Sequence, residues 1–305
     1  MNFNRRNFVK TGALAVAGTA VFGSSFCASQ KKNALTGLQL YSIRDDMARD
    51  PLGSLAQLTK MGYRYVEHAS YSDRKFYGYA PAEFKRILDG EGLSMVSGHV
   101  EFVRTDWNTG VNDFSDRWKY TVEDAATCGQ KYVVTPWLEE SIRRNYDDFM
   151  TFMDVFNKCG ELCSKWGMKF GYHNHDFEFS EQFNGESLFD IMMRSMDPGL
   201  VVVQLDTGNL FNGGAVAKDV VDRYPGRFEF VHLKDVISTG EEGRFESTIV
   251  GEGLADVREV LAMIEESGGA RVIIIEQEAY QGKTPMECAR INLVKMREWG
   301  YHTKL

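Results

Sequence analysis

Histidine and carboxylate side chains recur at the ends of short apolar segments along this chain, where they could hold a cation or move a proton. His99, Asp206 and Glu276 each end such a segment, and five of the six histidines lie at places of this kind, with His302 as the exception. A carboxylate-rich group with one or two imidazoles suits a hard or borderline divalent cation. Imidazoles and carboxylates also serve as general bases. The residue types therefore predict metal-assisted proton transfer.

Four residues form the predicted site for a single divalent metal ion: Glu178, Asp206, His232 and Glu276. They follow consecutive apolar segments, so we expect them to line one arc of a shared rim. Four protein ligands leave coordination positions open for substrate oxygens, which Lewis-acid catalysis requires. Glu276 follows four apolar residues, where an unpaired structural carboxylate would be costly. Asp206 has a structural alternative, as the N-cap of the helix that follows it.

The segment Tyr172–Glu178 offers more than one metal ligand. His173 and His175 point to the same side of an extended strand, because side chains two residues apart share a face, and Glu178 lies just beyond them. We expect Glu178 to bind the ion and the two histidines to contact the substrate or transfer protons. A histidine ligand in place of Glu178 remains the alternative.

The chemistry predicted for this site is proton removal next to a carbonyl. A cation that chelates the carbonyl and the adjacent hydroxyl of a keto-sugar makes the neighbouring C–H bond acidic, and Glu178, Glu276 or His175 would then remove the proton to leave an enediolate. Reprotonation on the other face is epimerisation, reprotonation at the other carbon is isomerisation, and loss of a β-leaving group is a lyase or dehydratase reaction. The predicted substrate-binding residues are Tyr41, His99, Trp137, His173, Lys234 and Glu278, and Phe102, Trp107 and Phe211 are further aromatic candidates for stacking on a sugar.

Two kinds of segment alternate along the chain and must position these residues. Eight short apolar or β-branched runs are predicted to be strands: 37–41, 64–67, 94–99, 131–136, 169–173, 200–206, 228–234 and 272–276. Helical-looking stretches lie between them: 52–61, 81–91, 114–128, 146–166, 187–196, 215–224, 254–267 and 285–299. This alternation, at roughly 25–45-residue spacing, indicates parallel βαβ units.

Eight such units are the number that closes a (β/α)8 TIM barrel, whose active site lies at the carboxyl ends of the strands. We expect one barrel domain at residues 34–305, because no linker-like tract divides this part of the chain. A doubly wound open sheet is the alternative fold, but no GxGxxG turn follows the first predicted strand.

Composition and charge exclude several classes of protein. Of the 305 residues, 43% are hydrophobic and 26% are charged, with 6 Pro and 5 Cys, which is typical of globular proteins and not of collagen-like, disordered or disulfide-scaffold chains. The formal net charge of −8 disfavours a nucleic-acid partner, because phosphate backbones are also negative. No uninterrupted apolar run of 18 or more residues occurs, so no permanent membrane span is expected.

The first thirty residues differ from the rest of the chain. Arg5 and Arg6, followed by Phe8 and a Gly/Ala/Val-rich stretch at 11–23, resemble a twin-arginine export signal. A basic helix of the mature fold is the alternative, although the glycines of the stretch would weaken it. We therefore expect residues 1–30 to be removed or disordered and the protein to be exported to the periplasm, with cleavage after Cys27 or, less in keeping with the bulky Phe26, a lipid anchor at Cys27.

Four cysteines follow this segment: Cys128, Cys159, Cys163 and Cys288. Outside the cytoplasm they could form disulfides. Cys159 and Cys163, however, lie one turn apart in a predicted helix, where a bridge between them would be awkward. We expect buried free thiols.

Several motifs together resemble the sugar phosphate isomerase/epimerase group of xylose-isomerase-like barrels, from about Gly37 to Gly300. The motifs are Gly37–Arg44, Tyr172–Phe179, Leu205–Asn209, Tyr224–Phe228, His232–Asp235, Val250–Gly253 and Ile275–Glu278. The resemblance implies a Glu/Asp/His/Glu site that holds one Mn²⁺ or a similar ion (Mg²⁺, Co²⁺ or Zn²⁺), carried over here to Glu178, Asp206, His232 and Glu276. In the epimerase branch the two glutamates also move protons on opposite faces of the substrate. Here the fifth strand ends in a His-Asn-His segment rather than directly in Glu, as in the dehydratase-like branch.

The function predicted from these features is a metal-dependent isomerase or epimerase for an unphosphorylated keto-sugar or ketose. One alternative is a lyase, dehydratase or hydratase for keto-glycosides or keto-inositols, and another is a non-catalytic sugar-binding barrel. A DNA-repair endonuclease of this fold is disfavoured, because Asn209 stands where its trinuclear site would need a histidine and no Asp-x-His pair follows His232. The segment Phe149–Phe156 suits either the buried face of a helix or a subunit contact in a homo-oligomer.

Overall fold

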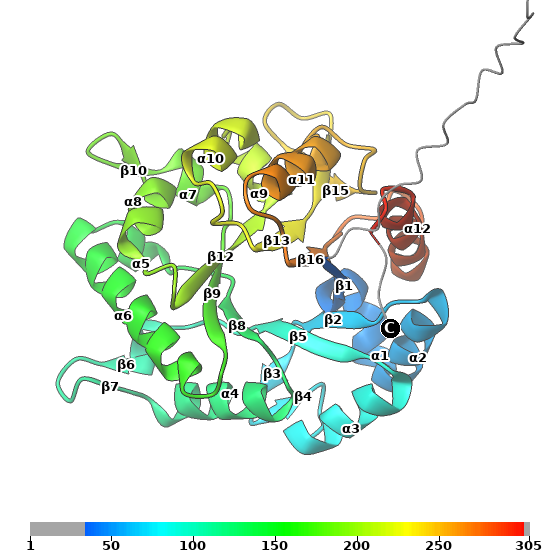
Figure 1. The fold of residues 1–305 in the computed structure, drawn as a ribbon, viewed down its shortest axis with the longest axis horizontal. Helices are drawn as coiled ribbons and strands as arrows, with labels where there is room; N and C mark the ends of the chain where they lie inside the picture. The colour runs from blue at the N-terminus through cyan, green and yellow to red at the C-terminus, as the bar shows by residue number, and fades with distance from the viewer. Residues whose placement is uncertain (1–33, 302–305) are drawn as a thin grey trace, which may run out of the picture. The chain divides into compact units, whose positions relative to one another are not determined.

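Eight parallel strands close into a barrel in the computed structural model, which describes residues 34–301 (Figure 1). The order around the barrel is β1-β2-β5-β8-β9-β12-β13-β16, and pairing of β16 with β1 closes the ring. The strands are β1 (Leu35–Gln39), β2 (Tyr65–His68), β5 (Ser94–His99), β8 (Tyr132–Thr135), β9 (Lys169–His173), β12 (Val201–Asp206), β13 (Phe230–Leu233) and β16 (Val272–Ile275). The predicted (β/α)8 barrel is confirmed, and the pairing of the first strand with the last excludes the open sheet.

Helices surround the barrel strands (Figure 1). They are η1 (Leu40–Ile43), α1 (Arg44–Arg49), α2 (Pro51–Met61), α3 (Pro81–Glu91), η2 (Arg104–Asp106), α4 (Asp116–Thr127), α5 (Glu140–Arg143), α6 (Tyr146–Ser164), α7 (Phe177–Ser180), α8 (Leu188–Ser195), α9 (Thr207–Asn212), α10 (Ala217–Arg223), α11 (Val257–Glu266) and α12 (Pro285–Glu298). Proline at the first helical position begins α2, α3 and α12, where its missing N–H costs nothing. At α12 the side chain of Thr284 also accepts from the backbone N–H of Glu287, completing a capping box.

Four small antiparallel hairpins extend the connections that follow barrel strands. They are β3–β4 (Tyr71–Ser72 with Lys75–Phe76), β6–β7 (Trp107–Asn108 with Asp113–Phe114), β10–β11 (Gln182–Phe183 with Glu186–Ser187) and β14–β15 (Asp235–Ser238 with Phe245–Thr248). Because each hairpin comes after the carboxyl end of a barrel strand, all four belong to the rim on which a TIM barrel builds its active site.

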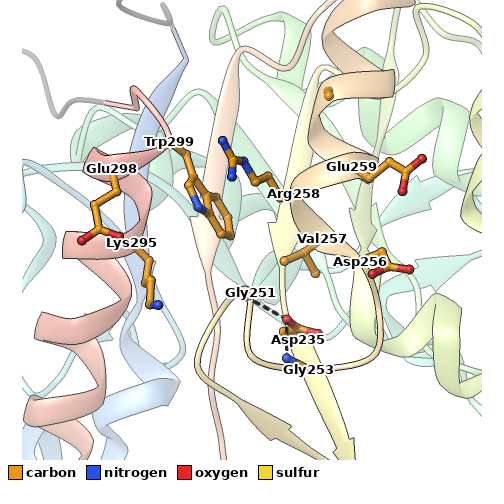
Figure 2. A pocket seen from close by; sticks show the side chains of 11 residues that line it. Asp235, Gly251, Gly253, Asp256, Val257, Arg258, Glu259, Lys295, Glu298 and Trp299 are labelled. Atoms are coloured by element: carbon orange, nitrogen blue, oxygen red, sulfur yellow. Dashed lines mark hydrogen bonds between the residues drawn. The ribbon is translucent and has the colours of Figure 1, made fainter. Parts of the chain in front are cut away.

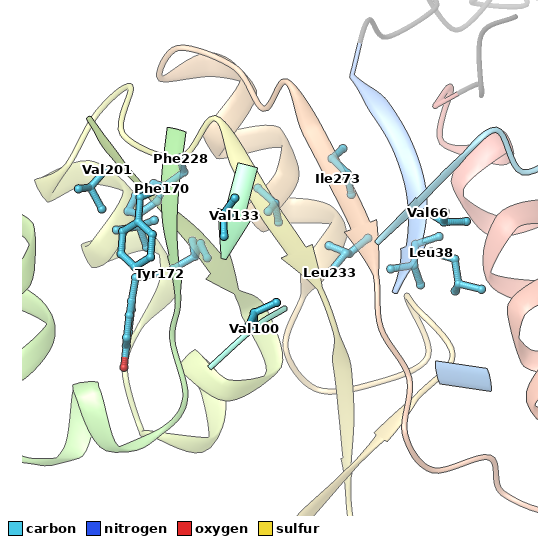
Figure 3. Close-up of a cluster of buried hydrophobic side chains, with 14 of the residues drawn as sticks. Leu38, Val66, Val100, Val133, Phe170, Tyr172, Val201, Phe228, Leu233 and Ile273 are labelled. Carbon is cyan, nitrogen blue, oxygen red and sulfur yellow. The ribbon is translucent and has the colours of Figure 1, made fainter. Parts of the chain in front are cut away.

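The apolar core has two parts. The larger part lies between the strands and the helices, and Figure 3 shows side chains that belong to it, among them Leu38, Val66 and Ile273. The smaller part fills the inside of the barrel and comprises Val96, Tyr132, Val134, Val202, Phe230, Val272 and Ile274. Alternate residues along one strand therefore serve the two parts.

Alternation along the strands also places the polar residues. On β12, Val202 belongs to the interior cluster, and Gln204 and Asp206 follow it at the same period of two, both fully buried. On β13, Phe230 and His232 repeat this arrangement. The barrel interior is thus apolar toward the amino ends of the strands and polar toward their carboxyl ends.

The cysteines and the aromatic segment of α6 are buried in this fold. Cys128, Cys159, Cys163 and Cys288 are all free and buried, as predicted. Within Phe149–Phe156, the side chains Phe149, Met153 and Phe156 are inaccessible to solvent and belong to the core, so this segment forms the inner face of a helix.

The predicted export signal at residues 1–30, including Cys27, lies outside the described residues. Among the described helices, none combines the length and the apolar character that a membrane crossing requires.

Candidate metal centre and active-site cavity

Four buried side chains at the carboxyl ends of neighbouring strands converge on one point: His173, Asp206, His232 and Glu276. Each offers a ligand atom within 4.8 Å of the others. Nδ1 of His232 lies 3.6 Å from Oδ2 of Asp206 and 3.4 Å from Oε2 of Glu276. Nε2 of His173 lies 3.8 Å from Oδ2 of Asp206. Three of the four predicted metal ligands are therefore together, and His173 is the fourth member.

Two potential ligand atoms of this cluster form no hydrogen bond with the rest of the described protein. Oδ2 of Asp206 and Nδ1 of His232 are buried and have no hydrogen-bond partner among residues 34–301. A buried polar atom without a hydrogen-bond partner costs free energy of folding, so a bound ligand at this point would stabilise the protein. A divalent cation would satisfy both atoms at once, and two imidazoles with two carboxylates are a donor set suited to borderline ions such as Zn²⁺ or Mn²⁺. The residues present fit a bound metal ion.

Electrostatics support the same conclusion. Burial would lower the pKa of His232, but Glu276 and Glu67 raise it well above its usual value. The negative potential that draws a proton to this imidazole also draws a divalent cation, which would displace the proton.

Beneath the cluster, the buried carboxylate of Glu67 fixes the orientation of His232. It accepts hydrogen bonds of 2.8 Å each from the side chains of Gln39, Gln204 and His232, the last through Nε2. Burial alone would raise the pKa of Glu67, but His99 and His232 hold the pKa of this carboxyl well below its usual range. Because Nε2 of His232 donates to Glu67, Nδ1 is the nitrogen that faces Asp206 and Glu276.

Gln204 performs the same task for His173. Its Oε1 lies 2.9 Å from Nδ1 of His173 and 2.7 Å from Nε2 of His99, while its amide nitrogen donates to Glu67. The amide oxygen must therefore accept from His173 Nδ1, so Nε2 is the nitrogen that faces Asp206, with the amide nitrogen of Asn209 3.5 Å from it. Gln204 is not among the residues predicted from the sequence for this site. The signal that was available is its position two residues before Asp206 on the same strand face.

Glu178, the fourth predicted metal ligand, is not brought to the cluster. It lies in the short helix α7, where its carboxylate accepts from the hydroxyl of Tyr172 and, at 2.7 Å, from the backbone N–H of His175. The side chain is fully buried, and burial raises the pKa of Glu178 to about 8. Glu178 therefore bonds the turn after β9 to Tyr172 and His175 and is not part of the cluster.

Lys234 lies among three carboxylates beside the cluster and lines the cavity described below. Its Nζ lies 2.7 Å from Oε2 of Glu276, 2.6 Å from Oε1 of Glu278 and 3.5 Å from Oδ2 of Asp206. Burial would lower the pKa of Lys234, but these carboxylates raise it well above its usual value. The group is a fixed ammonium ion beside the predicted metal ligands.

Above the cluster opens a cavity of about 550 Å³, here called the active-site cavity. It is lined by most of the residues that the sequence predicted for substrate binding or catalysis: Tyr41, His99, His173, His175, Lys234, Glu276 and Glu278. Burial, with a smaller contribution from Lys234, lowers the pKa of His175 to about 4, so this imidazole is neutral near pH 7. Trp137 does not line the cavity but packs edge-on against His175, with 5.0 Å between ring centroids.

Other side chains that the sequence suggested for this region lie elsewhere. Phe102 is buried in the core, Trp107 packs against Phe114, and Phe211 packs against Phe245. His68 ends β2 but packs against the β3–β4 hairpin, where it contacts Phe76 with 4.7 Å between ring centroids. Alternation explains this last case, because Glu67 takes the inward position on that strand.

A second cavity, of about 500 Å³, lies between α11 and α12, away from this cluster (Figure 2). Asp235 lies at its edge, buried, and accepts hydrogen bonds from the backbone N–H groups of Gly251 at 2.8 Å, Gly253 at 3.0 Å and Ala255 at 3.1 Å. Both oxygens of this carboxylate are thus occupied, and Asp235 holds the loop after β15 against the barrel.

Comparisons with known proteins agree with this fold. The family model described as a xylose isomerase-like TIM barrel matches residues 55–298. The chain is 30% identical to the inosose dehydratase of Geobacillus kaustophilus (strain HTA426) over 251 residues, which are 73% of this chain and 79% of that protein. In several other alignments with inosose dehydratases, the chain spans about half the length of the curated relative.

Solved structures share the fold. A sugar phosphate isomerase/epimerase from Parabacteroides distasonis ATCC 8503 superposes with a TM-score of 0.74 and 24% identity, covering 92% of this chain and 98% of that one. A protein called IOLI, described with a bound zinc atom, superposes with a TM-score of 0.69 and 14% identity, covering 87% of this chain and 98% of that one.

Proposed function

The chain belongs to the xylose isomerase-like TIM barrel family, and from this premise we propose that it is a divalent-metal-dependent lyase for an unphosphorylated keto-sugar. It would remove a proton next to the carbonyl and then expel a β-leaving group. The observation that carries the proposal is the convergence of four buried side chains, two of whose ligand atoms have no hydrogen-bond partner among the described residues: His173, Asp206, His232 and Glu276. Two of the four, His173 and Glu276, line the active-site cavity.

We assign the metal ligands to these four residues, with His173 in place of Glu178. When bound there, a divalent cation supplies Lewis acidity that polarises the substrate carbonyl and lowers the pKa of the neighbouring C–H bond. The zinc described for the IOLI structure supports a divalent ion in this fold. Mn²⁺ remains the ion expected from the sequence, with Mg²⁺, Co²⁺ and Zn²⁺ as alternatives.

Two groups of the cavity would carry the proton chemistry. His175 is neutral near pH 7 and faces the cavity, so it is placed to accept the proton as general base. The Lys234 ammonium donates hydrogen bonds and stabilises negative charge that develops on the enediolate oxygen. The C–H proton passes to His175, and the electron pair of that bond gives the enediolate. As the enediolate collapses to a carbon–carbon double bond, the bond to the β-oxygen breaks, and the protonated His175 returns its proton to the leaving oxygen. His99, Tyr41 and Glu278 would hold the substrate hydroxyls.

The position of Glu178 favours elimination over epimerisation. Epimerisation by two glutamates requires a carboxylate on each face of the substrate, as predicted for Glu178 and Glu276. Glu276 lines the cavity, but both oxygens of Glu178 are engaged by Tyr172 and by the backbone of His175. Elimination needs proton removal from one face only. The likeness to an inosose dehydratase, a lyase by name, supports this choice.

Isomerisation or epimerisation is the second candidate, since the reaction shares the enediolate and structural neighbours carry those names. In that case His175 and Glu276, both lining the cavity, would serve the two faces.

The charges of the cavity support an unphosphorylated substrate. Two cations line it, Lys234 and Arg117, and both are paired with carboxylates, the latter with Asp106. No unpaired cation among the described lining residues is left for a phosphate group.

Solvent deuterium exchange tests the proposal. The metal-loaded protein would be incubated in D₂O with ketoses, keto-glycosides and keto-inositols, and products followed by NMR. A lyase yields an unsaturated product, whereas an epimerase yields a deuterated stereoisomer. His175→Gln should abolish either outcome with the metal still bound. Absence of exchange with every substrate, in protein that holds its ion, would instead favour a sugar-binding barrel without catalysis.

We also propose, from the sequence of residues 1–30, that the enzyme works after export. Replacing Arg5 and Arg6 by lysine should retain the protein in the cytoplasm, as shown by cell fractionation. Cys27→Ala would distinguish a lipid anchor, because only an anchored protein would leave the membrane fraction.

A further inference from the structure

A smaller cavity of about 350 Å³ adjoins the active-site cavity. Its lining residues are Tyr71, Ser72, Asp73, Arg74, Arg117 and Tyr120. Tyr71 and Arg117 line both cavities, so the two spaces meet at these side chains. We call this second space the Tyr120 cavity.

Both guanidinium groups of the Tyr120 cavity are fixed by buried carboxylates. Nε of Arg117 donates to Oδ1 of Asp106 at 2.9 Å, and Asp106 is 1% exposed. Arg74 donates to the two oxygens of Asp124 at 2.6 and 3.0 Å, and Asp124 is 2% exposed. Because each positive charge is balanced in place, the cavity does not attract an anion. Each guanidinium still presents planar N–H donors, which suit hydroxyl groups.

The aromatic side of the cavity is equally constrained. Tyr71 donates its hydroxyl to Asp124 at 2.7 Å, and the guanidinium of Arg74 stacks 4.2 Å from the ring centroid of Tyr120. Arg74 itself lies in the two-residue turn of the β3–β4 hairpin, where both Asp73 (φ 49°) and Arg74 (φ 58°) adopt the left-handed conformation that non-glycine residues avoid. The turn of the hairpin is therefore in an unfavourable backbone conformation, and this conformation places Arg74 against Asp124 and Tyr120.

We propose that the Tyr120 cavity binds a second, neutral sugar ring attached to the reacting keto-sugar, so that the substrate is a disaccharide-like glycoside. Aromatic rings pack against the C–H faces of a sugar, and charge-balanced guanidinium groups donate to its hydroxyls. This inference rests on the proposed function in one respect, namely that the ring in the active-site cavity is the one that reacts. Occupation of the second cavity is a binding property that does not require turnover.

Calorimetric binding of unreactive sugars tests the proposal without catalysis. The probes are a panel of disaccharides (cellobiose, maltose, trehalose and lactose), the methyl glycosides of their component sugars, and phenyl glucoside. We expect at least one disaccharide to bind more tightly than either component methyl glycoside. Tyr120→Ala should remove this advantage by raising the Kd of that disaccharide roughly tenfold. The Kd values of the methyl glycosides should not change.

Two further variants define the specificity of this effect. Tyr41→Ala, in the active-site cavity alone, should weaken methyl glycosides and disaccharides alike. Tyr146→Ala removes another exposed tyrosine, 38% accessible compared with 42% for Tyr120, from outside both cavities and should change neither. Thermal unfolding by circular dichroism would verify that each variant is folded.

The outcomes separate this inference from the proposed function. If no disaccharide binds more tightly than its component methyl glycosides, or if Tyr120→Ala leaves the difference intact, the second-ring site is wrong, whatever the enzyme does to monosaccharides. If phenyl glucoside alone shows the advantage, the cavity takes an aromatic aglycone and the second-sugar assignment is wrong. If the binding difference is present while no keto-sugar exchanges protons in D₂O, the site stands and the proposed function fails.

Discussion

Nε2 of His232 lies 2.8 Å from Oε1 of Glu67, although the two residues are 165 positions apart in the sequence. Both side chains are completely buried. Through this contact a carboxylate from β2 fixes the ring of a histidine on β13, so that the opposite nitrogen faces Asp206 and Glu276. Carboxylate–histidine pairs of this kind orient the ligand and raise its basicity in metal sites.

Replacing Glu67 by Gln should weaken metal binding by about 10–100-fold, the usual cost of losing such a partner. The amide cannot accept from all three donors that surround it, so His232 would lose its fixed orientation. Competition with a fluorescent chelator measures the effect. Glu229→Gln, immediately before the amino end of β13, is the matched control and should bind metal like the wild type. An unchanged Kd for the Glu67 variant would contradict a positioning role.

Metal content should distinguish His173 from Glu178 as the fourth ligand. We expect His173→Gln and Glu276→Gln to lose the ion, as measured by elemental analysis of protein purified without added metal. Glu178→Gln should retain about one ion per chain, because this carboxylate is bonded to Tyr172 and His175. The opposite pattern, with the ion lost only from the Glu178 variant, would restore the ligand that the sequence suggested.

The raised pKa of Glu178 predicts a pH-dependent stability. Between the ordinary value of 4.5 and about 8, the folded protein keeps a proton that the unfolded chain has lost. The contribution of the protonated Glu178 to the stability of the folded protein is thus fully present below pH 4.5. As the pH rises from there toward 8, the free energy of unfolding decreases by about 1.4 kcal/mol per pH unit.

Urea unfolding of metal-free protein across this range tests the effect. Glu178→Gln should remove the part of the pH dependence of the free energy of unfolding that comes from this residue. Glu83→Gln, on the exposed face of α3, should leave that pH dependence unchanged. Parallel pH profiles for wild type and the Glu178 variant would show that Glu178 does not titrate in this way.

Gly98 allows β5 to pass close to His68. A Cβ atom at this position would lie 1.7 Å from Nε2 of His68, whose ring is held against Phe76. Gly98→Ala should therefore lower the free energy of unfolding by about 1–3 kcal/mol, the usual cost of overpacking. Gly90→Ala is the matched control, because the space around Gly90 in α3 is open within 4 Å and the change should stabilise the helix by about 0.5–1 kcal/mol. Equal urea midpoints for the two variants would refute the contact.

The succession of short apolar or β-branched runs and helical-looking stretches was sufficient to predict the eight strands, and their number predicted the closed barrel and the rim that carries the chemistry. This prediction succeeds because strand periodicity is a local property. The sequence Val202–Asp206, for example, states which side chains share a face before any partner strand is known. Asp206 and Glu276 were found at the ends of apolar runs, and alternation placed His232 and Lys234 on one side of their strand.

Tertiary structure alone decided which of these side chains meet. Glu178 and His173 are five residues apart and both fit the motif, but the turn after β9 brings only His173 to Asp206. Gln204 joins Glu67 across 137 residues, and the Tyr120 cavity joins a hairpin after β2 to the helix after β5. Closing the ring of strands creates these contacts, and a closed ring brings residues together by distance in space, which local periodicity does not encode.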